Sequence, residues 1–253
     1  MSRTIAISDA QLKRLRLYNA AMGVFHAAQG VIILALANDF ALPVTSTFME
    51  GPPGTELELR ELFELRIAWA IAAFVFISAA AHWLLAGPAF GWYAAGLRQQ
   101  RNYARWVEYS VSASIMIVLI AMLTGISEGA ALIGLFGVNA AMIAFGLAME
   151  RYEVPGRPSW LLFNLGCVFG AVPWLAIAVY VVSPGLEADP PGFVYGIFVS
   201  LFLFFNAFAL NMYLQYRRAG PWRSYVFGET AYVLLSLTAK SALAWQVFFP
   251  TLV

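Results

Sequence analysis

The chain has 253 residues, of which 61% are hydrophobic and only 11% are charged, and its mean hydropathy is +0.74. This composition excludes an ordinary soluble domain and predicts an integral membrane protein in contact with membrane lipids. The formal net charge of +1 gives no sign of a nucleic-acid partner, and we expect none. The single cysteine, Cys167, excludes an intramolecular disulfide; because it lies in an apolar run, we interpret it as a small core residue.

Seven apolar stretches are long enough to cross the hydrocarbon core of a bilayer, which takes roughly 20 helical residues. We therefore predict one domain, residues 1–253, built as an all-α bundle of seven transmembrane helices. No removable signal peptide is expected, because residues 1–17 hold no apolar segment followed by a small-residue cleavage site. The approximate spans are 18–37, 67–87, 93–124, 129–149, 160–182, 192–214 and 230–249.

The basic residues gather on one side of these spans. Of the 15 Lys and Arg residues, 12 lie in the N-terminal tail and in the second, fourth and sixth connections: Arg3, Lys13, Arg14, Arg16, Arg98, Arg101, Arg105, Arg151, Arg157, Arg217, Arg218 and Arg223. The other side carries two arginines and nine acids: Arg60, Arg66, Asp39, Glu50, Glu56, Glu58, Glu61, Glu64, Glu128, Glu187 and Asp189. The positive-inside rule then predicts a multi-pass cell-membrane protein with a cytoplasmic N-terminus and an extracellular C-terminus.

The first outer connection is the only one long enough to form structure of its own. Its residues alternate in polarity on both sides of the turn sequence GPPG (51–54), with Thr45 and Thr47 before the turn and Leu57 and Leu59 after it. This pattern predicts a short two-stranded β-ribbon. Because an isolated hairpin is marginally stable, we expect it to pack on a neighbour such as a second copy of the chain; a solvated acidic loop is the alternative.

Lys240 is the most informative ionisable residue, because it lies near the middle of the last span. A charged side chain at the centre of a membrane helix costs roughly 2.5 to 3.5 kcal/mol on the insertion scale, so such residues are candidates for function. At a depth of about 15 Å its stem does not easily reach the surface. Two interpretations stay open: a lysine that is ion-paired or lines a transport path, and a lysine that forms a covalent imine.

Glu108 is the expected carboxylate partner of Lys240, since Glu150, Glu153 and Glu229 lie at the ends of their spans. The third apolar run begins near Trp106, which would leave Glu108 only about 3 Å into the helix and too shallow to meet the lysine. We therefore predict that this helix starts earlier, near Tyr93. The three arginines that precede Glu108 would then lie on one helical face: Arg98, Arg101 and Arg105.

Four further polar residues lie at membrane depth and predict a hydrogen-bonded cavity: His26 in the first span, Ser78 and His82 in the second, and Asn139 in the fourth. The alternative is that the histidines are ordinary packing residues with satisfied hydrogen bonds. No second ligand occurs at a spacing typical of metal sites, so we expect no metal.

Aromatic residues are concentrated in the fifth and sixth spans, where most would serve packing, although a flat apolar ligand attached to Lys240 would need such walls. Several segments across the chain resemble heliorhodopsins, a branch of the microbial-type rhodopsins with inverted topology. The segments are LANDFALP (36–43), GPPG (51–54), RWVEYS (105–110), FGVN (136–139), PGFVYG (191–196) and AKSALAWQ (239–246). The topology read from the charges agrees with this resemblance.

The resemblance implies retinal as the cofactor, all-trans in the dark, with Lys240 as its Schiff-base lysine and Glu108 as the counterion. It also implies that Ser112 and Ser236 are hydrogen-bonding neighbours of the imine, and that the four polar residues form a cavity on the cytoplasmic side. Further residues would line the retinal: Tyr109, Met142, Ile143, Gly146, Trp174 and Phe205. The family is dimeric, so a homodimer is expected.

The missing carboxylates favour a sensor over a pump. Ordinary proton-pumping rhodopsins carry a second carboxylate eleven residues after the counterion and an Asp four residues before the lysine, where this chain has Leu119 and Ser236. We therefore predict photoisomerisation with local proton movement, no net pumping, and a sensory role with an unidentified cytoplasmic signalling partner. The alternatives are a light-driven or light-gated ion transporter and a membrane enzyme that modifies retinal or lipid; we expect no enzymatic activity.

Overall fold

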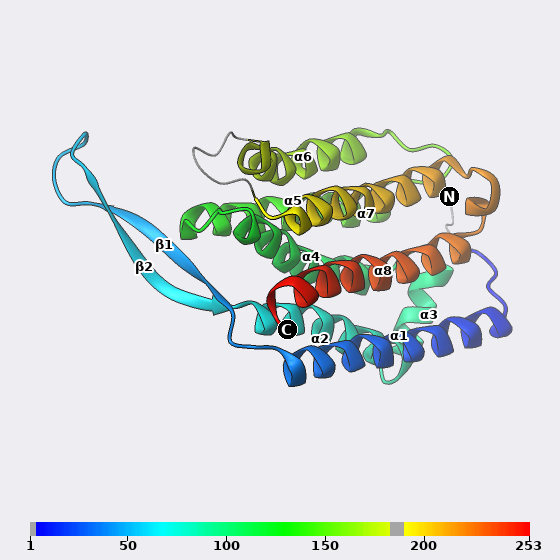
Figure 1. Ribbon diagram of the computed structural model, residues 1–253. Coiled ribbons are helices and arrows are strands. Elements are labelled where there is room, and N and C mark those ends of the chain that lie inside the picture. Colours follow the sequence, from blue (N-terminus) through cyan, green and yellow to red (C-terminus); the bar gives the residue numbers. More distant parts are fainter. Residues whose placement is uncertain (1–3, 183–189) are drawn as a thin grey trace.

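The computed structural model describes residues 4–182 and 190–253. Arg3, Glu187 and Asp189, which the charge count used, lie outside these ranges. Within them the chain forms eight α-helices, a 3-10 turn and one β-hairpin (Figure 1). The elements are α1 (Asp9–Leu36), β1 (Ala41–Met49), β2 (Leu57–Arg66), α2 (Ile67–Ala86), α3 (Phe90–Arg98), α4 (Tyr103–Leu123), α5 (Gly129–Tyr152), α6 (Leu161–Val182), α7 (Gly192–Arg217), η1 (Gly220–Arg223) and α8 (Tyr225–Thr251).

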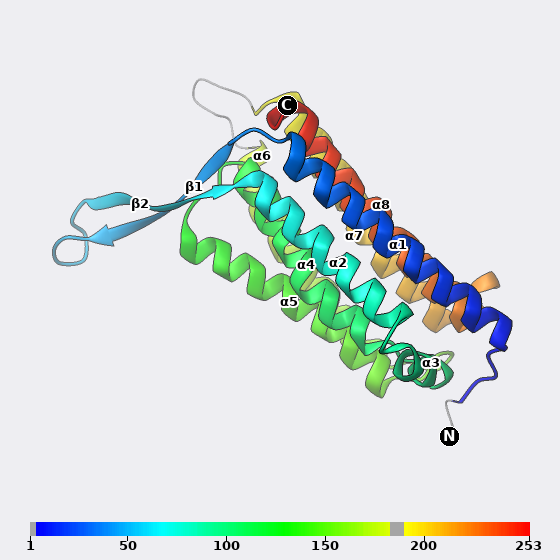
Figure 2. The ribbon, with the colours of Figure 1, turned by 90° about the horizontal axis from the view of Figure 1, so that it is seen from below.

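Seven of these helices are long and apolar enough to span a membrane, which confirms the predicted fold class: α1, α2, α4, α5, α6, α7 and α8. They run side by side as one bundle, and α3 lies across one end of it (Figures 1 and 2). We call this the α3 end and the other the hairpin end. Several helices exceed the predicted spans; α1 has 28 residues and is about 42 Å long, more than the hydrocarbon core requires.

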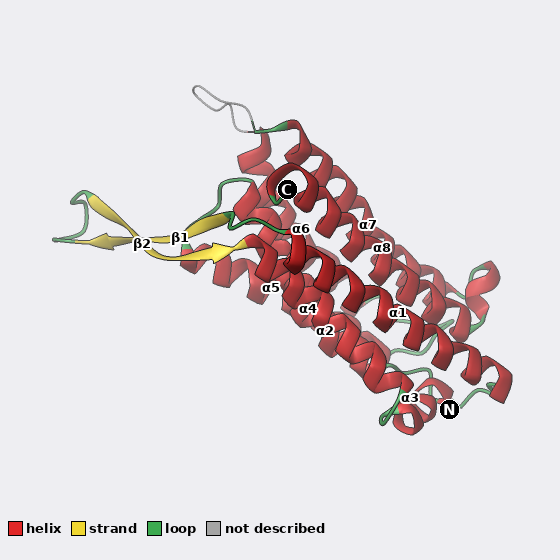
Figure 3. Ribbon diagram, turned by 60° about the horizontal axis from the view of Figure 1, so that its bottom comes forward, coloured by secondary structure: helices red, strands yellow, loops and turns green. Residues whose placement is uncertain are grey.

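The connection between the first two membrane helices forms the predicted ribbon. Strands β1 and β2 pair in antiparallel register, with a bulge between Val44 and Thr45, and the hairpin extends away from the bundle (Figure 3). Its base is held by the loop before α5: the Thr45 amide donates to the Ser127 carbonyl at 2.8 Å, and Ser46 Oγ donates to Glu128 Oε1 at 3.0 Å. Glu128 also caps α5, and the backbone amide of Ala131 lowers its pKa.

The depth of Glu108 led to the prediction that the third membrane helix starts near Tyr93. The structure shows that this prediction is wrong. Helix α3 ends at Arg98, and α4 begins at Tyr103 after a sharp corner. Gln100 adopts a left-handed φ of 57°, while the amides of Gln100 and Arg101 donate to the carbonyls of Leu97 and Gly96. This is the hydrogen-bond pattern of a Schellman motif, which stops a helix.

The start of α4 is fixed separately by Asn102, whose side chain accepts a hydrogen bond from the Arg105 amide. The three arginines therefore do not share one helical face. Arg98 is the last residue of α3, Arg101 lies in the connection, and Arg105 is in the first turn of α4. A hydropathy window averages over such a four-residue corner, so it could not reveal the break.

The main core lies between α2, α4 and α8 and continues toward the hairpin end. Its fully buried members include Phe74 of α2, Ile117 and Ile120 of α4, and Leu243 of α8. Few residues of helices α6 and α7 are buried inside the bundle, as expected for helices that face lipid. The candidate functional site lies between the dense core near α2 and the less buried helix α6.

Candidate functional site

Lys240 and Glu108 meet inside the bundle. Lys240 Nζ lies 2.8 Å from Glu108 Oε1, and the two side chains are only 3% and 9% exposed. The same nitrogen donates to Ser236 Oγ at 2.9 Å, one turn earlier on α8. The structure therefore places the amine, the carboxylate and one of the two predicted serines together.

The reach of the lysine removes part of the apparent mismatch in depth. Glu108 is five residues into α4, about 7.5 Å from its start, whereas Lys240 is fifteen residues into α8. Both helices begin at the α3 end, and helical side chains tilt toward the helix N-terminus. The lysine stem runs back by about one turn, so that its nitrogen lies at the level of Ser236. No upstream extension of α4 is needed.

The carboxylate is also held from α2. Ser78 Oγ donates to Glu108 Oε1 at 2.6 Å and lies 3.0 Å from the carbonyl of Phe74. Ser112, the second predicted serine, is fully buried one turn after Glu108, but its hydroxyl has no hydrogen-bond partner among the described residues. The carboxylate thus receives an ammonium from α8 and a hydroxyl from α2.

Three of the four residues of the predicted polar cavity lie together on the α1 and α2 side of Glu108. The rings of His26 and His82 are stacked, with centroids 5.6 Å apart. His82 Nδ1 lies 2.8 Å from Asn19 Oδ1, and neither ring nitrogen of His26 has a partner within the described part of the chain. The fourth residue, Asn139, lies elsewhere: it donates to Ser114 Oγ at 3.0 Å, between α5 and α4.

Asn19 was not predicted to belong to this polar cluster, although its position in the sequence could have indicated it. It precedes His26 by seven residues, or two helical turns, so the two share the buried face of α1. Its Nδ2 also donates to the carbonyl of Leu15 at 2.9 Å, which fixes the amide for the contact with His82. No group of three His, Cys, Asp or Glu side chains suited to a metal occurs among the described residues.

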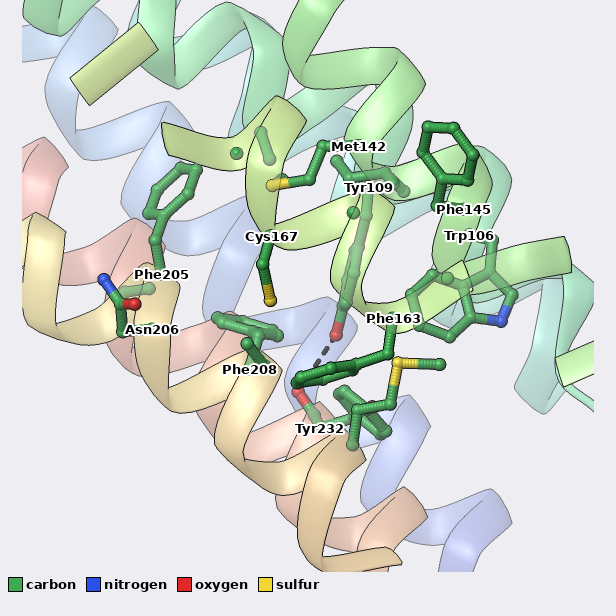
Figure 4. Close-up of a pocket in the computed structure, with 18 of the residues that line it drawn as sticks. Trp106, Tyr109, Met142, Phe145, Phe163, Cys167, Phe205, Asn206, Phe208 and Tyr232 are labelled. Carbon is green, nitrogen blue, oxygen red and sulfur yellow. Dashed lines mark hydrogen bonds between the residues drawn. The ribbon is translucent and has the colours of Figure 1, made fainter. Parts of the chain in front are cut away.

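A cavity of about 310 Å³ lies next to the lysine, between α4, α5, α6, α7 and α8. Its walls are mainly aromatic and apolar. Figure 4 shows Phe205 and Asn206 of α7 on one side and Trp106 of α4 and Phe145 of α5 on the other. All six predicted wall residues border it, as do Ser236 and Lys240: Tyr109, Met142, Ile143, Gly146, Trp174 and Phe205.

Glycine and aromatic packing shape these walls. A Cβ at Gly146 would collide with the ring of Trp106, and one at Gly170 would lie 2.7 Å from Met142 Sδ. The Tyr109 hydroxyl donates to the Tyr232 carbonyl at 3.0 Å, a bond drawn in Figure 4. The glycines thus allow two bulky side chains to lie flat against the neighbouring helices.

Cys167 is not the core residue predicted from its apolar surroundings. It is exposed and borders the cavity on α6, because that helix turns much of its surface to lipid. Further aromatic wall residues come from five helices: Trp106 of α4, Phe145 of α5, Phe163 of α6, Phe202 and Phe208 of α7, and Tyr232 of α8. Apolar residues at helical spacing do not reveal which of them face a cavity.

A second buried ionic cluster occupies the α3 end of the bundle. Arg105 donates to Glu229 Oε2 and, at 2.8 Å, to Glu150 Oε1, and its guanidinium lies over the ring of Tyr232. The arginine side chain is 4% exposed, and those of Glu150 and Glu229 are 4% and 1% exposed. The two acids do lie near helix ends, as predicted, but they are buried there.

Comparisons with known proteins show the fold and the family of the chain. Two solved structures share the fold, each with a TM-score of 0.64: the proton pumping rhodopsin AR2 from the marine alga Acetabularia acetabulum and the light-driven proton pump LR (Mac) from Leptosphaeria maculans. The first is 14% identical over 96% of both chains; the second is 13% identical over 96% of this chain and 95% of its own. A search of curated protein sequences gives no significant match. The heliorhodopsin family model matches residues 15–252, so the chain belongs to the heliorhodopsin family.

Proposed function

We propose that this protein is a light-sensing retinal protein in which Lys240 carries the chromophore as a protonated Schiff base and Glu108 is the counterion. The observation that carries the proposal is the buried pair of Lys240 and Glu108, 2.8 Å apart, beside an aromatic cavity of about 310 Å³. Bound retinal would supply absorption of visible light and isomerisation about a double bond.

The residues present fit this cofactor. The cavity volume falls at the lower end of the roughly 300–1,000 Å³ typical of small-molecule sites. Its walls hold flat aromatic side chains, and the lysine supplies the one primary amine in the wall. Trp174 makes edge contacts with Phe202 and Phe205, each at a centroid distance of 5.4 Å, which keeps that wall rigid.

The protein's own groups can hold a positive charge at the lysine nitrogen. Glu108 supplies the opposite charge, Ser236 accepts a hydrogen bond, and Ser78 donates to the carboxylate. Charge-assisted hydrogen bonds of this kind are the strong ones in a buried site. The stacked pair of His26 and His82 lies on the other side of Ser78, and we propose that a proton leaving the lysine side moves locally toward these rings.

We propose that this movement does not become net transport. Leu119 occupies the position where ordinary pumping rhodopsins have a second carboxylate, and it is fully buried in the same apolar core as Ile117 and Ile120. An apolar layer of this kind gives a proton no group to bind on the way to the hairpin end. The similarity to two proton pumps extends to the fold, at 14% and 13% identity.

The sensory role, the orientation and the partners belong to the same proposal. The charge distribution supports a cytoplasmic α3 end. The protruding hairpin supports a homodimer, because large apolar side chains on it are exposed, among them Leu59 at 65% and Phe63 at 55%. A signalling partner would then meet the cytoplasmic loops.

The test is the visible absorption spectrum of the purified protein after addition of all-trans retinal, with Lys240→Ala beside the wild type. We expect a visible band in the wild type and none in the variant. Circular dichroism would establish that the variant is folded. A folded wild type without a band would refute the proposal. A second experiment tests the absence of pumping: illumination of cells that express the protein should leave the pH of an unbuffered suspension unchanged. A light-driven pH change that a protonophore abolishes would refute the absence of pumping.

A further inference from the structure

A second, smaller cavity lies outside the retinal site, at the corner between α3 and α4. Its volume is about 140 Å³, and Trp92, Gln99, Arg101 and Tyr103 are among the residues that line it. It lies at the α3 end of the bundle, where α3 runs across the membrane helices (Figure 2). Nothing in the proposed photochemistry uses this cavity.

The corner holds Arg101 in a fixed position. The Arg101 amide donates to the Gly96 carbonyl at 2.9 Å as part of the Schellman motif that ends α3. A Cβ at Gly96 would lie 2.8 Å from the Arg101 carbonyl oxygen, so the close approach depends on glycine. The Arg101 guanidinium lies over the ring of Tyr103, 6.0 Å from its centroid.

Two polar side-chain atoms of this corner lack hydrogen-bond partners. Arg101 Nε and the Tyr103 hydroxyl are both buried and have no hydrogen-bond partner among the described residues. No carboxylate within the described ranges lies within ion-pair distance of Arg101. Buried donors are nearly always satisfied in folded proteins, and an arginine is always charged. Two unsatisfied donors, one of them on an unpaired cation, fit a bound anion.

The acids nearest to this corner are already engaged. Glu229 accepts hydrogen bonds from Tyr93, Asn102 and Arg105, and Glu150 accepts one from the Asn102 amide. Their charges point into the bundle, toward Arg105. Arg101, on the other side of Asn102, therefore has no carboxylate partner among the described residues and can bind a ligand from outside the chain.

The position of the cavity favours a lipid. Helix α3 buries Tyr93, Ala94 and Leu97 against the bundle and leaves Trp92 55% exposed, the arrangement of a short helix lying in the membrane interface. Tryptophan is enriched at the level of the lipid headgroups. Arginine binds phosphate through its planar set of N–H donors, and basic pockets at this level bind anionic headgroups.

We propose that this corner binds the phosphate group of an anionic phospholipid, with Arg101 and Tyr103 as its donors and Trp92 against the acyl-chain side. In the orientation proposed above, the lipid belongs to the cytoplasmic leaflet. The site is separate from the retinal cavity, so the proposal does not depend on the photoreceptor function.

Native mass spectrometry of the full chain tests this proposal, with phosphatidylglycerol or phosphatidylcholine added to the detergent-solubilised protein. We expect phosphatidylglycerol to be retained and phosphatidylcholine not. Arg101→Gln should lower the affinity for phosphatidylglycerol roughly ten-fold, the effect of losing a charge-assisted contact. Tyr103→Phe, which keeps the ring and the arginine, should lower it by a smaller factor.

Arg98→Gln is the matched control, because Arg98 lies three residues away, carries the same charge, and does not line the cavity. It should bind phosphatidylglycerol as the wild type does. Equal losses in Arg98→Gln and Arg101→Gln would show a diffuse surface charge and overturn the proposal. Equal retention of phosphatidylcholine, or displacement of the lipid by millimolar inorganic phosphate, would also overturn it. If Arg101→Gln fails to fold, wild-type affinity in Tyr103→Phe overturns the proposed donor pair.

Discussion

Replacing Arg105 with methionine should destabilise the protein strongly, because it leaves two buried carboxylates without their cation. The arginine side chain is 4% exposed and bonds to Glu150 and Glu229. Breaking a buried ion pair by removing one partner costs about 3–5 kcal/mol. We take the value for one pair, since one carboxylate can neutralise itself by binding a proton. At about 2–4 °C per kcal/mol for a chain of this size, Tm should fall by about 6–20 °C.

The measurement is thermal unfolding of the detergent-solubilised protein, followed by circular dichroism. A triple variant, Arg105→Met with Glu150→Gln and Glu229→Gln, should recover part of the lost Tm, because no unpaired charge remains. Arg98→Met is the surface control: its side chain is 43% exposed and lies 3.9 Å from Asp9, so its Tm should change little. A fall of less than about 2 °C in Arg105→Met would refute the reasoning.

Three further predictions concern the cavity, the counterion and the hairpin. Gly146→Ala should reduce the yield of the visible band by forcing the Trp106 ring to move, at a cost of about 1–3 kcal/mol. Gly137→Ala on the same helix, with open space around it, should not; equal losses would contradict this. Glu108→Gln should shift the band toward the ultraviolet at neutral pH, because an imine without its carboxylate partner no longer holds its proton; an unchanged band would exclude Glu108 as counterion. Glu128→Gln should speed hydrogen exchange at the base of the hairpin. Since the pKa of Glu128 is lowered by backbone and side-chain hydrogen bonds, its stabilising effect should be present at neutral pH and lost as pH falls through that pKa.

The fold class followed from hydropathy because a bilayer sets strict demands on length and polarity. Twenty apolar residues without a charge have few alternatives to a spanning helix. The pairing of Lys240 with Glu108 was predictable for the same reason, since a buried ammonium needs a buried carboxylate. The ribbon was predictable because turn residues separate two alternating segments. In each case a strong physical constraint leaves few alternatives for the residues concerned.

The features that the sequence did not reveal depend on contacts between distant segments. The α3–α4 corner rests on a backbone pattern around Gln100 that average hydropathy cannot detect. Glu229 lies close to a helix end, and only the approach of Arg105, 124 residues earlier, shows that it is buried. Asn139 has a polar neighbour on α4 that spacing on its own helix could not identify. In a seven-helix bundle, packing between helices sets the rotation of each helix about its own axis, and this rotation decides which side chains meet.

Two ion pairs join helices α4 and α8 at different levels, and this limits how α8 can move. One tie is Lys240 with Glu108, and the other is Glu229 with Arg105, eleven residues apart on α8 and three apart on α4. Rotation of α8 about its own axis would have to stretch both ties at once. A swing of α8 about the Arg105 level would loosen the lysine tie more than the arginine tie, and would also strain the hydrogen bond from the Tyr109 hydroxyl to the Tyr232 carbonyl. The α3 end would then act as a pivot, and the largest displacement would occur near the C-terminus, where Asn38 bonds to the carbonyls of Thr251 and Leu252.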